Sequence, residues 1–250
     1  MPMKEDRTEV QRPKILPVVL GRIALAGLLG LAILSGLVWA GTVSIPSRLN
    51  PFAPLRIADD INWLTRMKLF RLQSDRLMCR AVLEGASLDY RPVPDQALDE
   101  GCGLSNAVEV TEAAVAFSRS FTATCQLTVA WALFETHVMM PAARRYFDQA
   151  VAQVIHLGTY ACRNINHRAD GRRSEHAIAN AIDISGFVLT DGQRITLKDD
   201  WSGADPRKAA FLKTVRDGAC EIFNVVLSPD YNEAHRDHFH FDMGRHRACR

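Results

Sequence analysis

The stretch "GRRSEHAIANAIDISGFVLTDGQRITL" (residues 171–197) indicates how the centre of the fold is built. An Asp-Gly pair at 191–192 stands between two β-favouring runs, which is a strong signal for a two-residue hairpin turn. The first strand of this hairpin is predicted over residues 181–190, with Asp183 near its start. His176 then lies on a loop or short turn before the strand. We therefore expect an imidazole and a carboxylate to meet where a loop folds back beside a strand, and not along one helical face.

A second group of polar residues lies near the C-terminus, in "HFHFDM" (residues 238–243). The alternation predicts a strand with His238, His240 and Asp242 on one face and apolar residues on the other. Residues two apart on one face are about 6–7 Å apart, so one histidine can bind a metal while the other stands beside it. One of them, with the imidazole and carboxylate of the first stretch, makes a His2Asp set with an open fourth position, as in catalytic zinc sites. Asp242 could equally be an exposed or hydrogen-bonding strand residue.

The remaining pattern predicts an α+β fold, in which a small antiparallel sheet carries the zinc site and helices flank it. A helix is expected from about Asp60, with Ile61, Leu64, Met67 and Phe70 on its buried face. Two further elements are a strand within residues 107–117 and a helix over residues 125–147 capped by Thr124. A last helix is expected from Pro206, with Asp205 as its N-cap. Its apolar face consists of Phe211, Leu212, Val215, Ala219 and Ile222.

An uncharged run of 21 residues, 23–43, is long enough to span a bilayer. Five basic and three acidic residues precede it, so the positive-inside rule keeps the N-terminus in the cytoplasm and exports the rest. The predicted organisation is a cytoplasmic tail (1–22), a transmembrane signal anchor (23–43), a linker (44–59) and one domain (60–250). A signal peptide cleaved after Ala40 is the alternative. Either way the domain is exported, and we expect it in the periplasm on a single-pass inner-membrane protein, or secreted after cleavage.

Cysteine content and charge agree with export. All six cysteines follow the apolar run and lack C-x-x-C spacing, which favours up to three disulfides over a cysteine metal site, although the sequence leaves their pairing open. Residues 23–250 carry 25 basic and 25 acidic residues, so nothing indicates a nucleic-acid groove. Numerous soft surface ligands, which a metal carrier would need, are also missing from the sequence.

The stretch "SEHAIANAID" resembles the S-x-H-x-x-G-x-A-x-D motif of the LAS metallopeptidases, a group that includes zinc D-alanyl-D-alanine carboxypeptidases and murein endopeptidases. Ala179 replaces the glycine of the motif. "TYACR" (159–163) is similar to the arginine-bearing element of that group, and "HRDHFH" (235–240) to its closing H-x-x-H-x-H. More closely still, the chain from about Cys79 onward looks like the extensin-like C-terminal domain of bacterial extensin family proteins. This resemblance rests on "GCGLSNAV", "YACR", "SEHAIANAIDISGF" and "AHRDHFHFDM".

The resemblance implies a LAS- or hedgehog-like fold with a zinc site made of His176, Asp183 and His240. It also implies that Arg163 binds a substrate carboxylate or a developing oxyanion, and that Ser174 lies at the substrate site. Arg163 could equally be a structural ion-pair residue.

The general base is the least certain part of the motif. Carboxypeptidases of the group carry a glutamate where this chain has Asp237, three residues before His240. In a strand of period two, Asp237 points away from His240 unless the strand begins later or bulges there. His238 matches a histidine-based variant, so we expect His238 as the base and Asp237 as the second choice.

Location and chemistry together predict a zinc-dependent peptidase acting on peptidoglycan stem peptides. The alternative is a non-catalytic zinc-containing module that binds cell-wall peptides or polysaccharide. Hedgehog domains, which resemble the group, keep the zinc site without evident use as peptidases. The lack of an unambiguous base favours this alternative.

Overall fold

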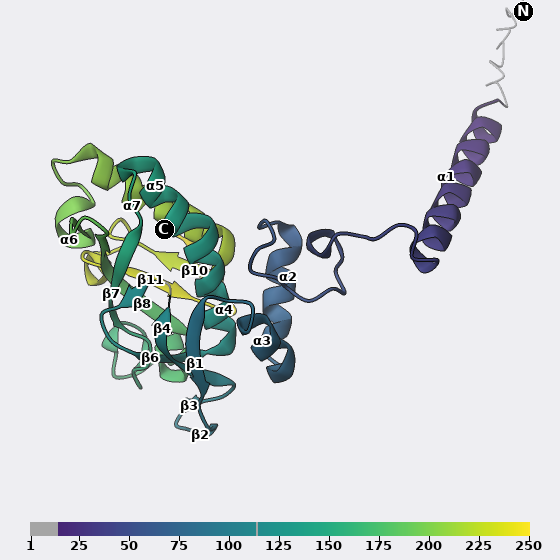
Figure 1. Cartoon of the computed structure of the whole chain (residues 1–250). Helices are drawn as coiled ribbons and strands as arrows, with labels where there is room; N and C mark the ends of the chain where they lie inside the picture. The colour runs from purple at the N-terminus through teal and green to yellow at the C-terminus, as the bar shows by residue number, and fades with distance from the viewer. Residues whose placement is uncertain (1–14, 114) are drawn as a thin grey trace, which may run out of the picture. The chain divides into compact units, whose positions relative to one another are not determined.

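The apolar N-terminal run forms one long helix, α1 (Ile15–Trp39), in a computed structural model that describes residues 15–113 and 115–250 (Figure 1). Its segment Val19–Trp39 is long and apolar enough to cross a membrane, and a signal sequence near the N-terminus has the same features. The predicted cytoplasmic tail, residues 1–22, lies mostly outside the described residues.

The helix ends at Trp39 and not at Val43, where the predicted span ended. Gly41 explains the difference, because its positive φ of 70° ends the helix in a left-handed turn. Its amide donates to the carbonyl of Val38. A count of uncharged residues does not register this stop signal.

Residues 47–250 form a second compact unit, which begins inside the predicted linker. Every buried hydrophobic residue of the described chain and all three disulfides lie within it, so this unit has a hydrophobic core of its own, as a domain that can fold alone requires. Its helices are α2 (Trp63–Leu72), α3 (Arg76–Leu83), α4 (Cys125–Phe134), α5 (Met140–Phe147), α6 (Leu197–Asp200) and α7 (Pro206–Ile222), with shorter turns η1 (Ser47–Leu49), η3 (Ile165–His167), η4 (Glu175–Ile178) and η5 (Glu233–His235).

The predicted α+β class is confirmed, with a larger central sheet than expected. Its strand order is β12-β10-β11-β8-β7-β5, with β9 beside β8; two of its pairs, β5–β7 and β10–β12, are parallel. Two small antiparallel sheets, β1-β4-β6 and β2-β3, stand apart from it. The strands are β1 (Leu88–Pro92), β2 (Gln96–Asp99), β3 (Cys102–Leu104), β4 (Ala107–Ala113), β5 (Ala116–Phe117), β6 (Phe121–Thr124), β7 (Val151–Gly158), β8 (Ala181–Leu189), β9 (Arg194–Thr196), β10 (Val225–Leu227), β11 (Phe239–Asp242) and β12 (Ala248–Cys249).

The strands β8 and β11 pair antiparallel in a register that places His240 directly opposite Asp183. Phe239 and Phe241, on the other face of β11, are fully buried, and each contributes about 2–3 kcal/mol by leaving water. A slip of one residue would exchange the two faces, so the apolar face fixes which polar residues meet.

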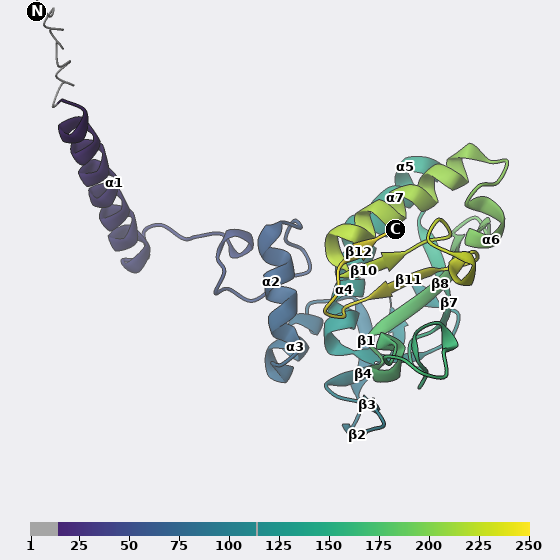
Figure 2. The same ribbon diagram turned by 180° about the vertical axis from the view of Figure 1, so that it is seen from behind.

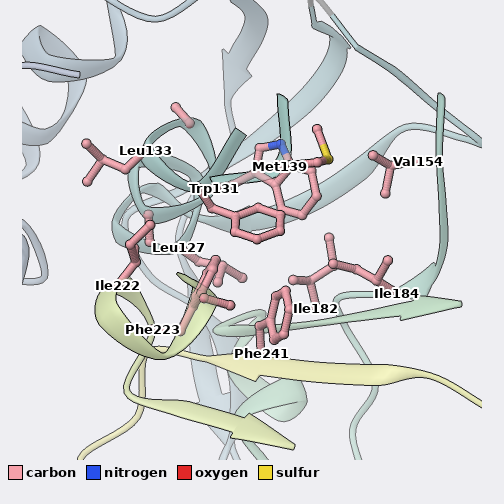
Figure 3. Packing of buried hydrophobic residues seen from close by; sticks show 14 of the residues in the cluster. Leu127, Trp131, Leu133, Met139, Val154, Ile182, Ile184, Ile222, Phe223 and Phe241 are labelled. Atoms are coloured by element: carbon pink, nitrogen blue, oxygen red, sulfur yellow. The ribbon is translucent and has the colours of Figure 1, made fainter. Parts of the chain in front are cut away.

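The core is built around α4, all ten residues of which are buried. Such a helix is hydrophobic on every side and must be surrounded by other elements. Trp131 and Leu127 of α4 stand opposite Phe241 and Ile182 of the sheet (Figure 3). The helices α5 and α7 run side by side over the same side of the sheet (Figure 1 and Figure 2).

The helix predicted over residues 125–147 is interrupted by a π-helical segment, η2 (Glu135–Met139). Pro141, at the start of α5, has no amide hydrogen, and its ring would clash with the carbonyl four residues earlier. The wider turn accommodates it: the amide of Met140 bonds to the carbonyl of Glu135, five residues back. The predicted cap is confirmed, since Thr124 Oγ1 accepts from the amide of Leu127 at 3.2 Å.

The buried face predicted for the first domain helix is wrong in part. Leu64 is buried, but Phe70 is 68% exposed, and the inner face of α2 consists of Leu64, Thr65, Lys68, Leu69 and Leu72. The three-residue spacing used for the prediction drifts around a helix of 3.6 residues per turn, so it loses the face within two turns.

The helix α7 is as predicted, with Asp205 as its N-cap and the five expected residues buried. It packs closely on η2 at Gly218, where a β-carbon would overlap the methyl groups of Val138. We expect Gly218→Ala to lower the free energy of unfolding by about 1–3 kcal/mol, because an added carbon must push two packed elements apart. Urea unfolding followed by circular dichroism measures this. Gly85→Ala, whose β-carbon meets only ordinary contacts, should be near neutral; equal losses would refute the packing argument.

The three disulfides are Cys79–Cys125, Cys102–Cys162 and Cys220–Cys249, and no cysteine is free. The first joins α3 to α4 inside the core. The third joins α7 to the last strand. This pairing is consistent with a periplasmic or extracellular domain.

Candidate functional site

The strand, the hairpin and the short turn predicted from the first stretch are present and bring its polar residues together. The strand β8 begins at Ala181, its hairpin with β9 is formed, and His176 lies on the short turn η4. His176 Nε2 lies 3.1 Å from Asp183 Oδ1 and 3.1 Å from His240 Nδ1. The third side of the triangle, His240 Nδ1 to Asp183 Oδ1, is 2.9 Å. All three residues are buried.

In each of the two histidines, the ring nitrogen that points away from the triangle determines whether the nitrogen inside the triangle carries a hydrogen. Nδ1 of His176 lies 3.0 Å from the carbonyl oxygen of Thr159, which can only accept, so this nitrogen carries the hydrogen. Nε2 of His240 likewise donates to the carboxylate of Asp242 at 3.0 Å. Each neutral ring therefore presents a lone pair toward Asp183. Outer contacts of this kind orient the histidine ligands of metal sites.

The cluster has to hold one positive charge. Three lone pairs at about 3 Å would otherwise face one another in a buried place. Without a metal this charge is a proton: although burial opposes it, hydrogen bonds to Asp183 and Asp242 raise the pKa of His240 to about 9. Burial also works against ionised Asp183, but hydrogen bonds from His176 and His240 outweigh it and hold the pKa of that carboxyl far below its usual range. Two imidazoles and one carboxylate are a ligand set that suits zinc, and a metal ion would take the place of the proton.

His238 stands beside the triangle, one residue before β11 begins. Its Nδ1 donates to the carboxylate of Asp237 at 2.9 Å, so its other nitrogen, Nε2, is left with a lone pair. That nitrogen faces Asp183 Oδ1 at 4.0 Å. Because the strand starts at Phe239, Asp237 lies in the preceding turn and contacts His238 and not the triangle. This hydrogen bond, ahead of other causes, lowers the pKa of Asp237.

His235 completes a group of imidazoles, with its ring 5.2 Å from that of His238 and 6.0 Å from that of His240. Burial, and then the charge of His240, lowers its pKa to about 4. His235 is therefore neutral at physiological pH, and its Nδ1 contacts Asn232 at 2.7 Å.

Arg163 lies beside the cluster and is partly exposed. Its Nη2 is 3.9 Å from Asp183 Oδ2, the carboxylate oxygen that the histidines do not use, and the side chain is 27% exposed. At this distance the guanidinium is attracted to the carboxylate without a hydrogen bond to it. The geometry therefore agrees with an electrostatic contact and leaves donors that can face a ligand.

Ser174, predicted to bind substrate, has a local structural contact. Its hydroxyl caps η4 by accepting from the amide of His176 at 3.4 Å. Ala179, which replaces the glycine of the motif, ends this turn with a positive φ of 54°. The role of Ser174 at a substrate site stays a prediction.

Two contacts of the site could not be found from residue types. Thr159 acts through its backbone carbonyl, for which the sequence has no signal. Asp242 was expected on the correct face of β11, but the alternation alone did not distinguish an exposed carboxylate from one that holds His240. Its second oxygen accepts from the amide of Gly244 at 2.8 Å, which orients the carboxylate.

The disulfide Cys102–Cys162 links the start of β3 to Cys162, which immediately precedes Arg163. We expect Cys102→Ala/Cys162→Ala to lower the free energy of unfolding by about 4 kcal/mol, because the bond closes 60 residues of chain and restricts the unfolded state. Urea unfolding of the oxidised protein measures this. A loss below about 1 kcal/mol would contradict this argument, because it would mean that the bond strains the folded state or that the unfolded chain keeps structure.

Comparison with known proteins gives one match. No curated protein and no solved structure matches the chain. The model of one protein family matches residues 77–250, which include every residue of the cluster, Arg163 and all three disulfides. The chain therefore belongs to the family described as extensin-like protein C-terminus.

Proposed function

We propose that this domain is a zinc-dependent peptidase that acts on the stem peptides of peptidoglycan, held at the periplasmic face of the inner membrane by α1. The observation that carries the proposal is the convergence of His176, Asp183 and His240, with both outer ring nitrogens already engaged. The LAS-like spacing of these residues in the sequence supports it.

The three converging atoms would hold the metal, which leaves a fourth position open for a ligand, as in catalytic sites. A zinc ion there would supply a Lewis acid toward a peptide carbonyl and would make water nucleophilic near neutral pH. Arg163 is placed to bind a carboxylate of the peptide or to stabilise negative charge on a carbonyl oxygen.

His238 is the group that can move a proton. Its Nε2 carries a lone pair and faces Asp183, the carboxylate that Arg163 also approaches. Asp237 holds the ring through Nδ1 and stabilises the imidazolium that forms when Nε2 takes a proton. In this proposal Asp237 positions the base, and His238 is the base.

The substrate class follows from location. A domain exported behind an apolar helix and closed by three disulfides works outside the cytoplasm, where peptidoglycan offers short peptides with free carboxylates. A partly exposed arginine beside the site fits such a terminus.

A zinc-containing module that binds wall peptides or polysaccharide is the second candidate. The enclosure of the cluster favours it, because the side chains of His176, Asp183 and His240 are 3%, 12% and 11% exposed. Such burial is usual in sites where a metal supports structure.

The experiment uses residues 47–250 produced in an oxidising compartment. Elemental analysis gives the bound metal, and incubation with muropeptides followed by mass spectrometry identifies cleaved bonds. One zinc per chain with cleavage supports the peptidase. One zinc with retention of muropeptides but no cleavage supports the binding module, and absence of zinc overturns both.

A further inference from the structure

The beginning of the domain displays an unusual number of exposed apolar side chains. Phe52, Trp63, Phe70 and Leu77 are 84%, 79%, 68% and 80% exposed. Among the large apolar residues described in 47–250, one other, Leu98 at 69%, exceeds two-thirds exposure. Scattered exposed apolar residues are ordinary, but four within 26 consecutive positions indicate a surface that contacts something.

Two of these side chains lie on a helix face that cannot turn into the core. Trp63 and Phe70 are seven positions apart on α2 and so share one face of the helix. The opposite face, which includes Leu64 and Leu69, is buried and packs against α4. The face of α2 that carries Trp63 and Phe70 therefore stays exposed on the surface of the domain.

The chain that enters the domain is held firmly on the same helix. Lys68 Nζ donates to the carbonyl of Ser47 at 2.7 Å, and Arg71 Nη1 donates to that of Pro51 at 2.6 Å. Asn62 Nδ2 bonds to the carbonyl of Arg48 at 2.8 Å. The chain from the end of α1 at Trp39 to Ser47 covers eight residues, which reach at most about 28 Å when fully extended. A short tether thus joins an apolar helix of membrane-spanning length to a fixed point on α2.

The charge of this region differs from that of the rest of the domain. Residues 47–80 carry seven basic residues, of which Lys68 is buried, and three acidic residues, whereas residues 81–250 carry 18 basic and 22 acidic residues. Aromatic side chains among basic ones are typical of surfaces that lie in the interface of an anionic bilayer.

We propose that the face of α2 that carries Trp63 and Phe70, here called the membrane-proximal patch, docks on the anionic lipid surface of the membrane that α1 crosses, and that the exposed side chains of Phe52 and Leu77 add to this contact. The domain then lies on the bilayer with α2 against the headgroups. This inference rests on the proposed anchoring by α1 for its location, and it is independent of the zinc site.

The test uses residues 47–250 with their disulfides formed and vesicles of phosphatidylglycerol and phosphatidylethanolamine. This domain has three tryptophans, of which Trp131 and Trp201 are 2% and 5% exposed, so Trp63 alone can respond to lipid. We expect co-sedimentation that weakens with salt, a blue shift of tryptophan fluorescence, and quenching by lipids brominated in their acyl chains. Absence of co-sedimentation, or binding without any change in fluorescence, would overturn the proposal.

The double variant Trp63→Ser/Phe70→Ser should bind the vesicles at least about tenfold more weakly, because it removes two inserted aromatic side chains. Leu98→Ser is the matched control, with the same exposure as Phe70, and should bind like the parent. Equal losses in the two variants would refute the patch. A parent that dimerises in solution and loses its dimer in the double variant would assign the patch to a second copy of the chain instead. Zinc content, measured on the same samples, separates failure of this inference from failure of the proposed site.

Discussion

Replacing His240 by alanine is expected to reduce bound zinc from about one per chain to below a tenth, and to abolish cleavage of muropeptides. Loss of an outer contact to a metal ligand already costs about 10–100-fold in affinity, so loss of a ligand should cost more than about 1,000-fold. The remaining pair, His176 and Asp183, has too few donors to hold the ion at working concentrations. Elemental analysis after dialysis, together with mass spectrometry of the products, measures both effects.

The control for this variant is His246→Ala. His246 is exposed and contacts Arg172 at 2.6 Å, away from the triangle, so its loss should leave zinc and cleavage unchanged. Because His240 is buried, His240→Gln is made alongside to keep its volume, and near-ultraviolet circular dichroism checks that both variants fold. A folded His240 variant that retained a full equivalent of zinc would remove His240 from the site.

Much of this site could be predicted because it depends on local patterns. The Asp-Gly turn placed β8, and alternation in "HFHFDM" placed the two phenylalanines in the core and His240 on the other face. These signals work because period-two alternation and turn chemistry act within a few residues. The register that sets His240 opposite Asp183 then follows from burying Phe239 and Phe241.

The parts that could not be predicted depend on contacts distant in sequence. The carbonyl of Thr159 reaches His176 across 17 positions, and a backbone group leaves no trace in the residue type. The disulfide pairing is likewise set by the packing of α3, α4 and α7. The face of α2 was predicted wrongly for another reason: residues three apart drift around a helix of 3.6 residues per turn, so Phe70 lies on the outer face while Leu64 and Leu69 are buried.

Replacing His238 by alanine is expected to separate metal binding from catalysis. Its ring is not part of the triangle, since Nε2 lies 4.0 Å from Asp183 Oδ1, so the variant should keep about one zinc per chain. If Nε2 accepts the proton during peptide hydrolysis, kcat should fall by about 100- to 10,000-fold with KM little changed. Asp237→Asn should lower kcat by a similar factor, because the amide no longer stabilises the imidazolium and can donate to Nδ1, which favours the tautomer with its hydrogen on Nε2. The pH profile should shift as well. Arg236→Ala, whose side chain pairs with Glu233 at the surface, is the control. A His238 variant with full zinc and full activity would show that His238 is not the base and that another group takes the proton.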